Sequence, residues 1–284
     1  MQTGALYRLV RDRFRAAGLP TPELDAKLLV SAALCLAVSD LILREHDEVG
    51  EDAQARALSH AESRLAGMPV GRILGEREFY GRRFLLNTAT LEPRPDTETL
   101  IDAVLARSDP DAALTMCDIG TGTGAIAVTL LCEMPRSRMI AVDLSEEALT
   151  CAMANARLHG VAERLLPVRA DYTSALRQAG DGGLDWVISN PPYIRTAVLA
   201  SLSEEVTRHD PVLALDGGES GLEAYRRIVA DAEYLLGPGG GIVLEIGFDQ
   251  AEDLKKQLRH HGFGAIEIIK DLAGNDRVAV ARKS

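Results

Sequence analysis

Aromatic residues, long apolar runs and closely spaced cysteines are scarce in this chain. Aromatic side chains make up 4% of its 284 residues, and no apolar run approaches the roughly 20 residues that a membrane-spanning helix needs. The first residues, MQTGALYRLVRDRF, lack the continuous apolar core of a signal peptide. The four cysteines show no C-x-x-C spacing, so neither a zinc site nor a disulfide framework is indicated. We therefore expect a cytoplasmic protein with reduced thiols, no metal site and no membrane partner.

An excess of basic residues is also missing. The net charge is −11, and residues 1–75 hold nine Lys and Arg against ten Asp and Glu. The remainder of the chain therefore carries almost the whole acidic excess. Because the binding of DNA is dominated by neutralisation of its phosphates, an acidic body is a poor electrostatic match for it. We expect no stable nucleic-acid partner, although a local basic patch is not excluded by the overall charge.

The pattern of apolar residues divides the chain into three parts. Residues 1–75 have the periodicity of amphipathic helices and predict a small helical domain. Residues 76–95, with β-branched and aromatic residues around Gly81, predict a β-hairpin linker. In residues 96–284, short apolar strands alternate with helices, which indicates an α/β domain with a parallel sheet covered on both faces. The last two predicted strands are joined by a short loop and should be antiparallel.

A glycine-rich turn, CDIGTGTGAIAV, joins the first predicted strand of the α/β domain to a helix. Glycines there let the backbone turn sharply and let a ligand approach the main chain. The spacing is G-x-G-x-G rather than the G-x-G-x-x-G of dinucleotide-binding folds. A tight turn without a ligand is the alternative interpretation, and for the acid it is a helix-capping role. The candidate cofactor-binding residues of this turn are Asp118, Gly120, Thr121, Gly122, Thr123 and Gly124.

Two further strands end in acidic residues that should lie beside this turn. Asp143 closes the second strand and could accept hydrogen bonds from two ribose hydroxyls, each contributing about 1.5–3 kcal/mol. Asp171 follows the third strand and could accept from an adenine amino group while Tyr172 packs on the ring; a surface acid is an equally good interpretation. No lysine is placed to hold phosphates, which favours S-adenosylmethionine over ATP, with S-adenosylhomocysteine as the product.

The fourth strand runs into the rigid turn SNPPYI. The side-chain oxygen of Asn190 and the carbonyl of Pro191, held by Pro192, could accept the two N–H bonds of an amide or an exocyclic amine. Tyr193 would supply a flat wall. Such a nitrogen is a weak nucleophile, so most of the rate would come from orientation and preorganised dipoles. We therefore predict Asn190, Pro191, Pro192 and Tyr193 as catalytic residues, with Asn190 also bordering the cofactor; an ordinary rigid turn is the alternative.

Together these motifs resemble the HemK/PrmC family, the N5-glutamine methyltransferases of peptide chain release factors. The resemblance spans residues 5 to 280 and includes NPPY, DIGTGTG, PVGRILGEREFYGRRF, EPRPDTETLI, LALDGGESGLEAYRRI, LEIG and DLAGNDR. It implies a class I S-adenosylmethionine-dependent methyltransferase, with a Rossmann-like seven-stranded sheet whose last strand is antiparallel. It also implies an N-terminal helical substrate-recognition domain and, as substrate, the glutamine of the Gly-Gly-Gln loop in class I release factors.

Some residues and alternatives stay open. Arg94, Pro95, Thr97 and Glu98 match a family segment near the site, but a structural linker is the simpler interpretation. Glu245 is an acid inside an apolar run, either paired or facing a partner. An N6-adenine methyltransferase acting on DNA or RNA would share the NPPY chemistry. So would a glutamine methyltransferase acting on a ribosomal protein. A cofactor-binding module without turnover would not need the NPPY turn. We expect a monomer.

Overall fold

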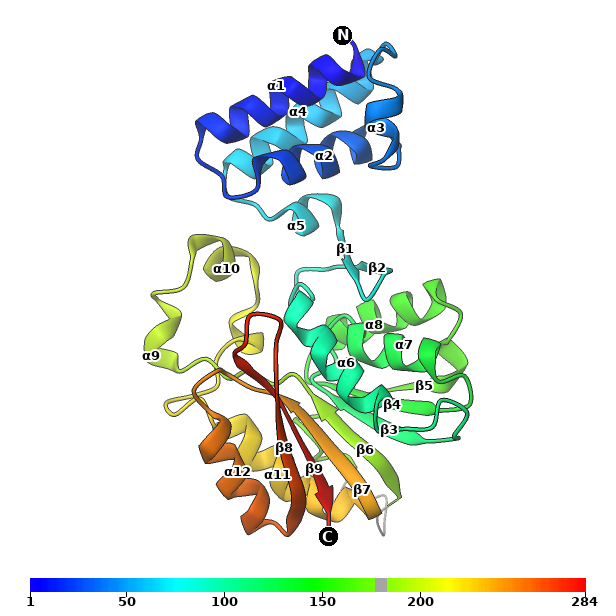
Figure 1. The fold of residues 1–284 in the computed structure, drawn as a ribbon, viewed down its shortest axis with the longest axis vertical. Coiled ribbons are helices and arrows are strands. Elements are labelled where there is room, and N and C mark those ends of the chain that lie inside the picture. Colours follow the sequence, from blue (N-terminus) through cyan, green and yellow to red (C-terminus); the bar gives the residue numbers. More distant parts are fainter. Residues whose placement is uncertain (177–182) are drawn as a thin grey trace. The chain divides into compact units, whose positions relative to one another are not determined.

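The computed structural model describes residues 1–176 and 183–284, which form two compact units, Met1–Glu76 and Arg77–Ser284 (Figure 1). Within these residues, no helix has both the length and the apolar character needed to cross a bilayer. Each unit has a hydrophobic core of its own. The two are described separately below.

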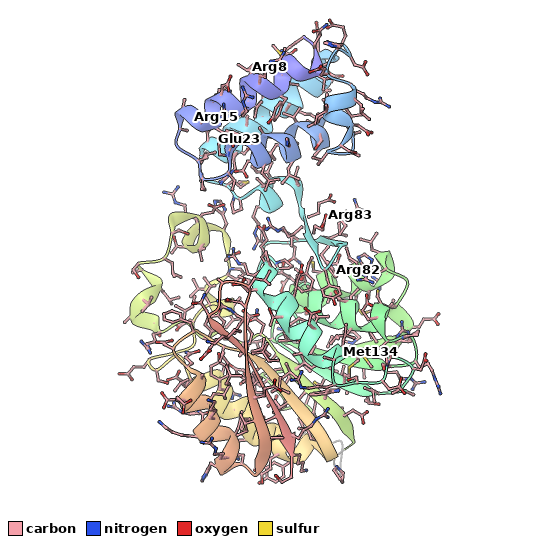
Figure 2. All side chains as sticks on the ribbon, in the orientation of Figure 1. Arg8, Arg15, Glu23, Arg82, Arg83 and Met134 are labelled. Atoms are coloured by element: carbon pink, nitrogen blue, oxygen red, sulfur yellow. The ribbon has the colours of Figure 1, made fainter. Side chains whose placement is uncertain are left out.

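The first unit consists of helices. Residues Leu6, Val10 and Phe14 recur every four positions along its first helix and are completely buried in the unit's core, as expected for one face of an amphipathic helix. An ion pair between Asp25 and Arg64 is also buried, with an Oδ2–Nε distance of 2.7 Å. The helices are α1 (Thr3–Ala16), α2 (Pro22–Ala33), α3 (Asp40–Leu43), α4 (Glu51–Leu65) and α5 (Val70–Leu74). At the surface, Arg15 of α1 forms an ion pair with Glu23 of α2 (Figure 2).

The predicted hairpin is present as β1 (Glu76–Phe79) and β2 (Arg82–Leu85). Tyr80 and Gly81 connect the strands with φ angles of +52° and +67°, the left-handed backbone that a two-residue hairpin turn favours. Its two phenylalanines, at positions 79 and 84, are buried in the core of the second unit. The hairpin is therefore an integral part of that unit rather than a free linker.

The second unit is built on a seven-stranded sheet with the order β5-β4-β3-β6-β7-β9-β8. β9 runs antiparallel to both of its neighbours, and the other pairs are parallel, so the predicted antiparallel final strand is confirmed. The strands are β3 (Thr115–Ile119), β4 (Arg138–Asp143), β5 (Leu165–Arg169), β6 (Leu184–Ser189), β7 (Leu236–Glu245), β8 (Phe263–Lys270) and β9 (Asp276–Lys283).

Helices cover both faces of this sheet (Figure 1). Both faces of β6 are therefore apolar. Trp186 and Ile188 pack on the face covered by α6, α7 and α8, and Val187 packs on the face covered by α11 and α12. The helices of this unit are α6 (Glu98–Leu105), α7 (Ala125–Glu133), α8 (Glu146–Leu158), α9 (Thr196–Leu199), α10 (Glu204–His209), α11 (Glu223–Leu235) and α12 (Ala251–His260). Short 3₁₀ turns are η1 (Pro95–Thr97), η2 (Ala162–Arg164) and η3 (Val212–Ala214).

The strand order reverses between β3 and β6. The chain proceeds from β3 outward through β4 and β5, and then returns to β6 on the other side of β3. In such sheets, ligands bind at the carboxyl ends of the strands where the order switches. The Ser189 hydroxyl donates to the Ile119 carbonyl over 2.6 Å, which holds the two strand ends together. The fold thus brings the glycine-rich turn and the NPPY turn to one edge of the sheet.

Candidate active site

A hollow lies at the carboxyl ends of β3, β4 and β6, at the point where the strand order switches. It is lined by segments far apart in the sequence, from the region before α6 to the turn η3. We call it the first hollow. The predicted site residues that line it are Gly120, Thr121, Gly122, Thr123, Asp143, Asp171, Tyr172, Asn190, Pro191 and Pro192. The fold therefore brings most of the predicted cofactor residues together.

Backbone hydrogen bonds hold the glycine-rich turn against the end of β4. The N–H groups of Gly120 and Thr121 both donate to the Val142 carbonyl, over 2.8 and 2.9 Å. Gly120 has a φ of +74°, and a Cβ added there would meet no atom within 4 Å. The turn therefore presents an open backbone to the first hollow, which is the geometry that close approach of a ligand requires.

Gly124, also predicted to bind the cofactor, is not among the residues that line the first hollow. Its φ is +76°, and an added Cβ would lie 3.0 Å from the Cβ of Ala152 on α8. The glycine is needed for the close approach of α7 and α8, as the third glycine of such loops often is. The structure thus gives this glycine a packing role, and its contact with the cofactor stays a prediction.

Asp118 lies in the interior of the second unit. Its side chain is completely buried and is absent from the lining of the first hollow. The carboxylate Oδ2 accepts the Thr121 hydroxyl over 2.7 Å, and among the described residues Oδ1 has no partner. Burial raises the pKa of Asp118 to about 7. The carboxylate supports the glycine-rich turn through Thr121 and the first turn of α7 through the Ala127 N–H, in line with the helix-capping interpretation, and a contact with the cofactor stays a prediction.

The acidic ends of β4 and β5 have different surroundings. Asp143 is half-buried and accepts backbone N–H groups on each oxygen, from Gly122 on Oδ2 and from Ser145 on Oδ1, both over 2.9 Å. Each carboxylate oxygen can accept a further hydrogen bond. Asp171 is exposed and forms an ion pair with an arginine of α11, Arg227, over 2.6 Å.

That arginine was not predicted from the sequence. Its guanidinium carbon lies 4.3 Å from the ring centroid of Tyr172, a cation–π contact. Tyr172 is half-buried and has a φ of +51°, and burial raises the pKa of its hydroxyl. Arg227 thus fixes both Asp171 and Tyr172 at the edge of the first hollow. The periodicity of α11 predicts a helix but gives no sign that this one position faces the site.

A second hollow adjoins the first. Asn190 and Pro191 line both, whereas Tyr193 and Glu245 line only the second. The apolar part of the second lining comes from Leu91, Ile194, Leu202, Val206, Ala214 and Leu215. The first two residues of the NPPY turn therefore stand where the two hollows meet. A group in one hollow and a group in the other would face each other across this turn.

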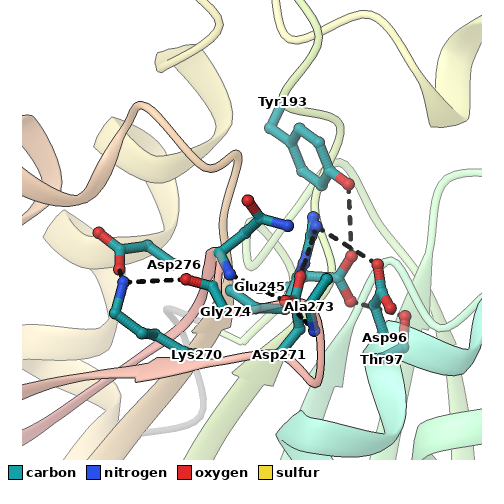
Figure 3. Close-up of polar contacts among 11 residues, drawn as sticks. Asp96, Thr97, Tyr193, Glu245, Lys270, Asp271, Ala273, Gly274 and Asp276 are labelled. Atoms are coloured by element: carbon teal, nitrogen blue, oxygen red, sulfur yellow. Dashed lines mark hydrogen bonds and ion pairs between the residues drawn. The ribbon is translucent and has the colours of Figure 1, made fainter.

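A hydrogen-bonded chain supports the turn from the side of β7. Asn190 Nδ2 donates to the Thr97 hydroxyl oxygen over 3.2 Å, and that hydroxyl donates to Glu245 Oε2 over 2.6 Å. The Tyr193 hydroxyl donates to Glu245 Oε1 over 3.4 Å (Figure 3). Glu245 is only 2% exposed. Burial raises its pKa to about 7, although the Thr97 hydrogen bond and the nearby Arg277 act in the opposite direction.

Glu245 is therefore paired, and it also lines the second hollow. Its position inside an apolar run was the sequence signal, since an acid is seldom fully buried without partners. Thr97 carried no comparable signal, because its segment looked like a linker. Arg94 lines both hollows and forms an ion pair with Asp210 over 2.6 Å. Among the described residues, no cluster of three or more His, Cys, Asp or Glu side chains could hold a metal ion.

Comparison with known proteins identifies the fold and the family of this chain. A PrmC N-terminal domain model matches residues 5–75, and a Methyltransferase small domain model matches residues 95–213. A methyltransferase of known structure from Pyrococcus furiosus aligns with a TM-score of 0.54 and 18% identity, covering 72% of this chain and 91% of that one. The class I methyltransferase fold predicted from the sequence is confirmed.

Two relatives align along nearly their whole length. The release factor glutamine methyltransferase of Agrobacterium fabrum is 42% identical over 278 residues, which cover 96% of this chain and 94% of the relative. That of Bradyrhizobium diazoefficiens is 42% identical over 280 residues, which cover 97% and 93%. Similarity of this extent includes both units and the hairpin. The chain belongs to the release factor glutamine methyltransferase family.

Proposed function

We propose that this protein transfers a methyl group from S-adenosylmethionine to the side-chain amide nitrogen, N5, of the glutamine in the Gly-Gly-Gln loop of class I peptide chain release factors. The observation that carries the proposal is the position of Asn190 and Pro191, which line both the first and the second hollow. One hollow suits the methyl donor and the other suits the acceptor glutamine. The names of the relatives give the class of acceptor.

The first hollow suits an adenosine-based cofactor that carries no phosphate. Among the described residues that line it, Arg94 is the only cation, and its charge is already paired with Asp210. A triphosphate would therefore find no free counter-charge. The open backbone at Gly120 and the carboxylate of Asp143 would hold the methionine portion and the ribose of S-adenosylmethionine. When bound, the cofactor supplies an electrophilic methyl group on a sulfonium.

The second hollow suits a glutamine side chain. Its aliphatic lining matches the two methylenes, and Asn190 and Pro191 lie where it meets the first hollow. Asn190 Oδ1 and the Pro191 carbonyl would accept the two amide N–H bonds, and the Tyr193 ring would lie against the amide plane. These acceptors orient the nitrogen and favour electron density on the side that faces the sulfonium. Such orientation is the main contribution that a protein can make to attack by a weak nucleophile. Once alkylated, the nitrogen loses a proton to water.

The helical residues 1–75 are proposed to recognise the body of the release factor. Their near-neutral balance of nine basic and ten acidic residues is compatible with binding a protein surface. The match of residues 5–75 to a domain model found in this family supports a role tied to the family's substrate. Catalysis itself is proposed to rest on residues 96–284, with the hairpin of residues 76–95 packed against them.

A methyl-transfer assay with labelled S-adenosylmethionine tests the proposal. The acceptors are an unmethylated class I release factor, a ribosomal protein preparation and unmethylated DNA. We expect label on the release factor alone, and its loss when the enzyme carries Asn190→Ala. Label on the ribosomal proteins or on DNA, with none on the release factor, would show that the substrate is assigned wrongly even though the enzyme is a methyltransferase.

A further inference from the structure

The carboxamide of Asn190 can be held in two orientations, and only one of them suits the proposed chemistry. Its oxygen accepts hydrogen bonds and its nitrogen donates them. To hold a glutamine amide, the oxygen must face the acceptor N–H. The reversed orientation would set an NH₂ group against the N–H of the substrate, donor against donor. Something must therefore select the orientation.

The structure selects it through Thr97. Asn190 Nδ2 donates to the Thr97 hydroxyl oxygen over 3.2 Å, so the Nδ2 group is engaged on the side of η1. A threonine hydroxyl has one proton to donate and two lone pairs. The proton of Thr97 is directed to Glu245 Oε2, over 2.6 Å. With its proton committed in that direction, the hydroxyl oxygen can only accept from Asn190.

Glu245 fixes the direction of the whole chain. An ionised carboxylate accepts hydrogen bonds and donates none. Both of its oxygens are used in this way, since Thr97 donates to Oε2 and Tyr193 donates to Oε1 (Figure 3). While Glu245 is ionised, the hydrogen bonds therefore run from Asn190 through Thr97 to Glu245.

We propose that Glu245 and Thr97 are positioning residues that set the orientation of the Asn190 carboxamide for methyl transfer. This inference rests on the function proposed above. Thr97 acts on Asn190 by direct contact, and Glu245 acts through Thr97. Because both Thr97 and Glu245 are buried, water cannot readily replace either partner.

Protonation of Glu245 would weaken this selection. A proton on Oε2 would be donated to Thr97, whose own proton would then be free to point at Asn190 and favour the reversed carboxamide. With a pKa of about 7, the carboxylate is ionised above that pH and neutral below it. The rate of methyl transfer should fall as the pH drops through about 7. The charged and titratable groups that face Glu245 are Arg277 of β9, Asp96 of η1, Tyr193, and Tyr225 of α11.

The test compares two substitutions of Thr97 with a control at another buried threonine. Thr97→Val keeps the shape and removes the hydroxyl, whereas Thr97→Ser keeps a hydroxyl. Thr129→Val is the matched control, because the Thr129 hydroxyl on α7 is fully buried and has no partner among the described residues. For each variant, kcat and KM are measured with an unmethylated release factor, and the dissociation constant of S-adenosylmethionine is measured by calorimetry.

We expect Thr97→Val to lower kcat by about 10- to 100-fold, the range that misorientation of a reacting group costs. The affinity for S-adenosylmethionine should stay within about twofold of wild type. Thr97→Ser should restore most of the rate, and Thr129→Val should leave it unchanged. A Thr97→Val enzyme with the kcat of the Thr129→Val control would overturn the inference. A wild-type enzyme that binds cofactor but leaves the release factor unmethylated would instead refute the proposed function.

A second measurement applies if Thr97→Val fails to fold. The single-turnover rates of wild type and Asp118→Asn are followed between pH 6 and pH 9. Asp118→Asn separates the two buried carboxylates, because the pKa of Asp118 is also about 7. A loss of rate below pH 7 in both enzymes would support the role of Glu245. A wild-type rate that is flat from pH 6 to pH 9 would overturn it, and so would an acid limb that disappears in Asp118→Asn.

Discussion

The backbone N–H of Gly122 donates to the Asp143 carboxylate over 2.9 Å, which ties the turn after β3 to the end of β4. The carboxylate thus has two tasks in the proposed site. It shapes the glycine-rich turn, and we propose that its remaining lone pairs accept hydrogen bonds from the ribose. Both residues line the first hollow.

Replacing this carboxylate should weaken cofactor binding. In Asp143→Asn the charge is lost, and each hydrogen bond from a ribose hydroxyl to a charged acceptor is worth about 1.5–3 kcal/mol. We expect the dissociation constant of S-adenosylmethionine to rise by about 10- to 100-fold, measured by isothermal titration calorimetry. Asp171→Asn is the comparison, because that carboxylate is exposed and already paired with Arg227. Asp171→Asn should raise the dissociation constant less than Asp143→Asn does. Equal increases would argue against the proposal that Asp143 binds the ribose.

The packing role of Gly124 predicts a loss of stability and a specific rescue. Gly124→Ala places a Cβ 3.0 Å from the Cβ of Ala152 on a backbone with a φ of +76°. We expect the free energy of unfolding in urea to fall by about 1–3 kcal/mol. Gly120→Ala is the control, because its φ is nearly the same but its Cβ meets nothing. Its loss should be smaller.

The double variant isolates the contact between α7 and α8. Adding Ala152→Gly to Gly124→Ala removes the methyl group that the new Cβ would meet. The double variant should therefore be more stable than the sum of the two single changes predicts, which is the signature of direct coupling. Strict additivity would mean that the Ala152 methyl group does not oppose the new Cβ, and that backbone strain or the Ala152 Cα, 3.1 Å away, requires the glycine.

The buried carboxylate of Asp118 predicts a pH dependence of stability. Its folded-state pKa of about 7 lies above the ordinary value of 3.8. A carboxyl group shifted in this direction contributes its full stabilisation below about pH 4, and that contribution is lost as the pH rises through about 7. In Asp118→Asn this loss is removed. The free energy of unfolding of the variant, minus that of wild type, should therefore be larger at pH 8 than at pH 5 when measured in urea. The same difference at both pH values would contradict the raised pKa of Asp118.

Removal of the helical unit should separate recognition from chemistry. A chain of residues 76–284 retains the hairpin, both hollows and the core of the second unit. It should bind S-adenosylmethionine within about twofold of the full chain. Methylation of an intact release factor should fall sharply, whereas a short Gly-Gly-Gln peptide should be methylated equally by both chains. Undiminished turnover on the intact factor would contradict the recognition role.

The sequence predicted what is local and left out what depends on distant neighbours. The NPPY turn and the glycine-rich turn are continuous segments that follow apolar strands, so their places at the sheet edge follow from the α/β pattern. The contact of Thr97 with Glu245 joins residues 148 positions apart, and no spacing rule connects them. Its only trace in the sequence is an acid within an apolar strand.

Gly124 and Asp118 illustrate the same point. Both belong to the glycine-rich turn, and a linear motif does not show which of its residues face a ligand and which face the neighbouring helices. In the structure Gly124 packs closely against Ala152, and the side chain of Asp118 is completely buried. Arg227 was missed for the complementary reason, since an arginine on an amphipathic helix usually faces solvent.

The central claim concerns one atom, the N5 nitrogen of a glutamine in the Gly-Gly-Gln loop. The most direct measurement is tandem mass spectrometry of an unmethylated class I release factor after reaction with the enzyme and S-adenosylmethionine, using Asn190→Ala as the inactive control. The account predicts a single added methyl group on the side-chain amide of that glutamine, absent from the control reaction. A methyl group on any other residue, or an unmodified loop after reaction with an enzyme that binds the cofactor, would contradict it.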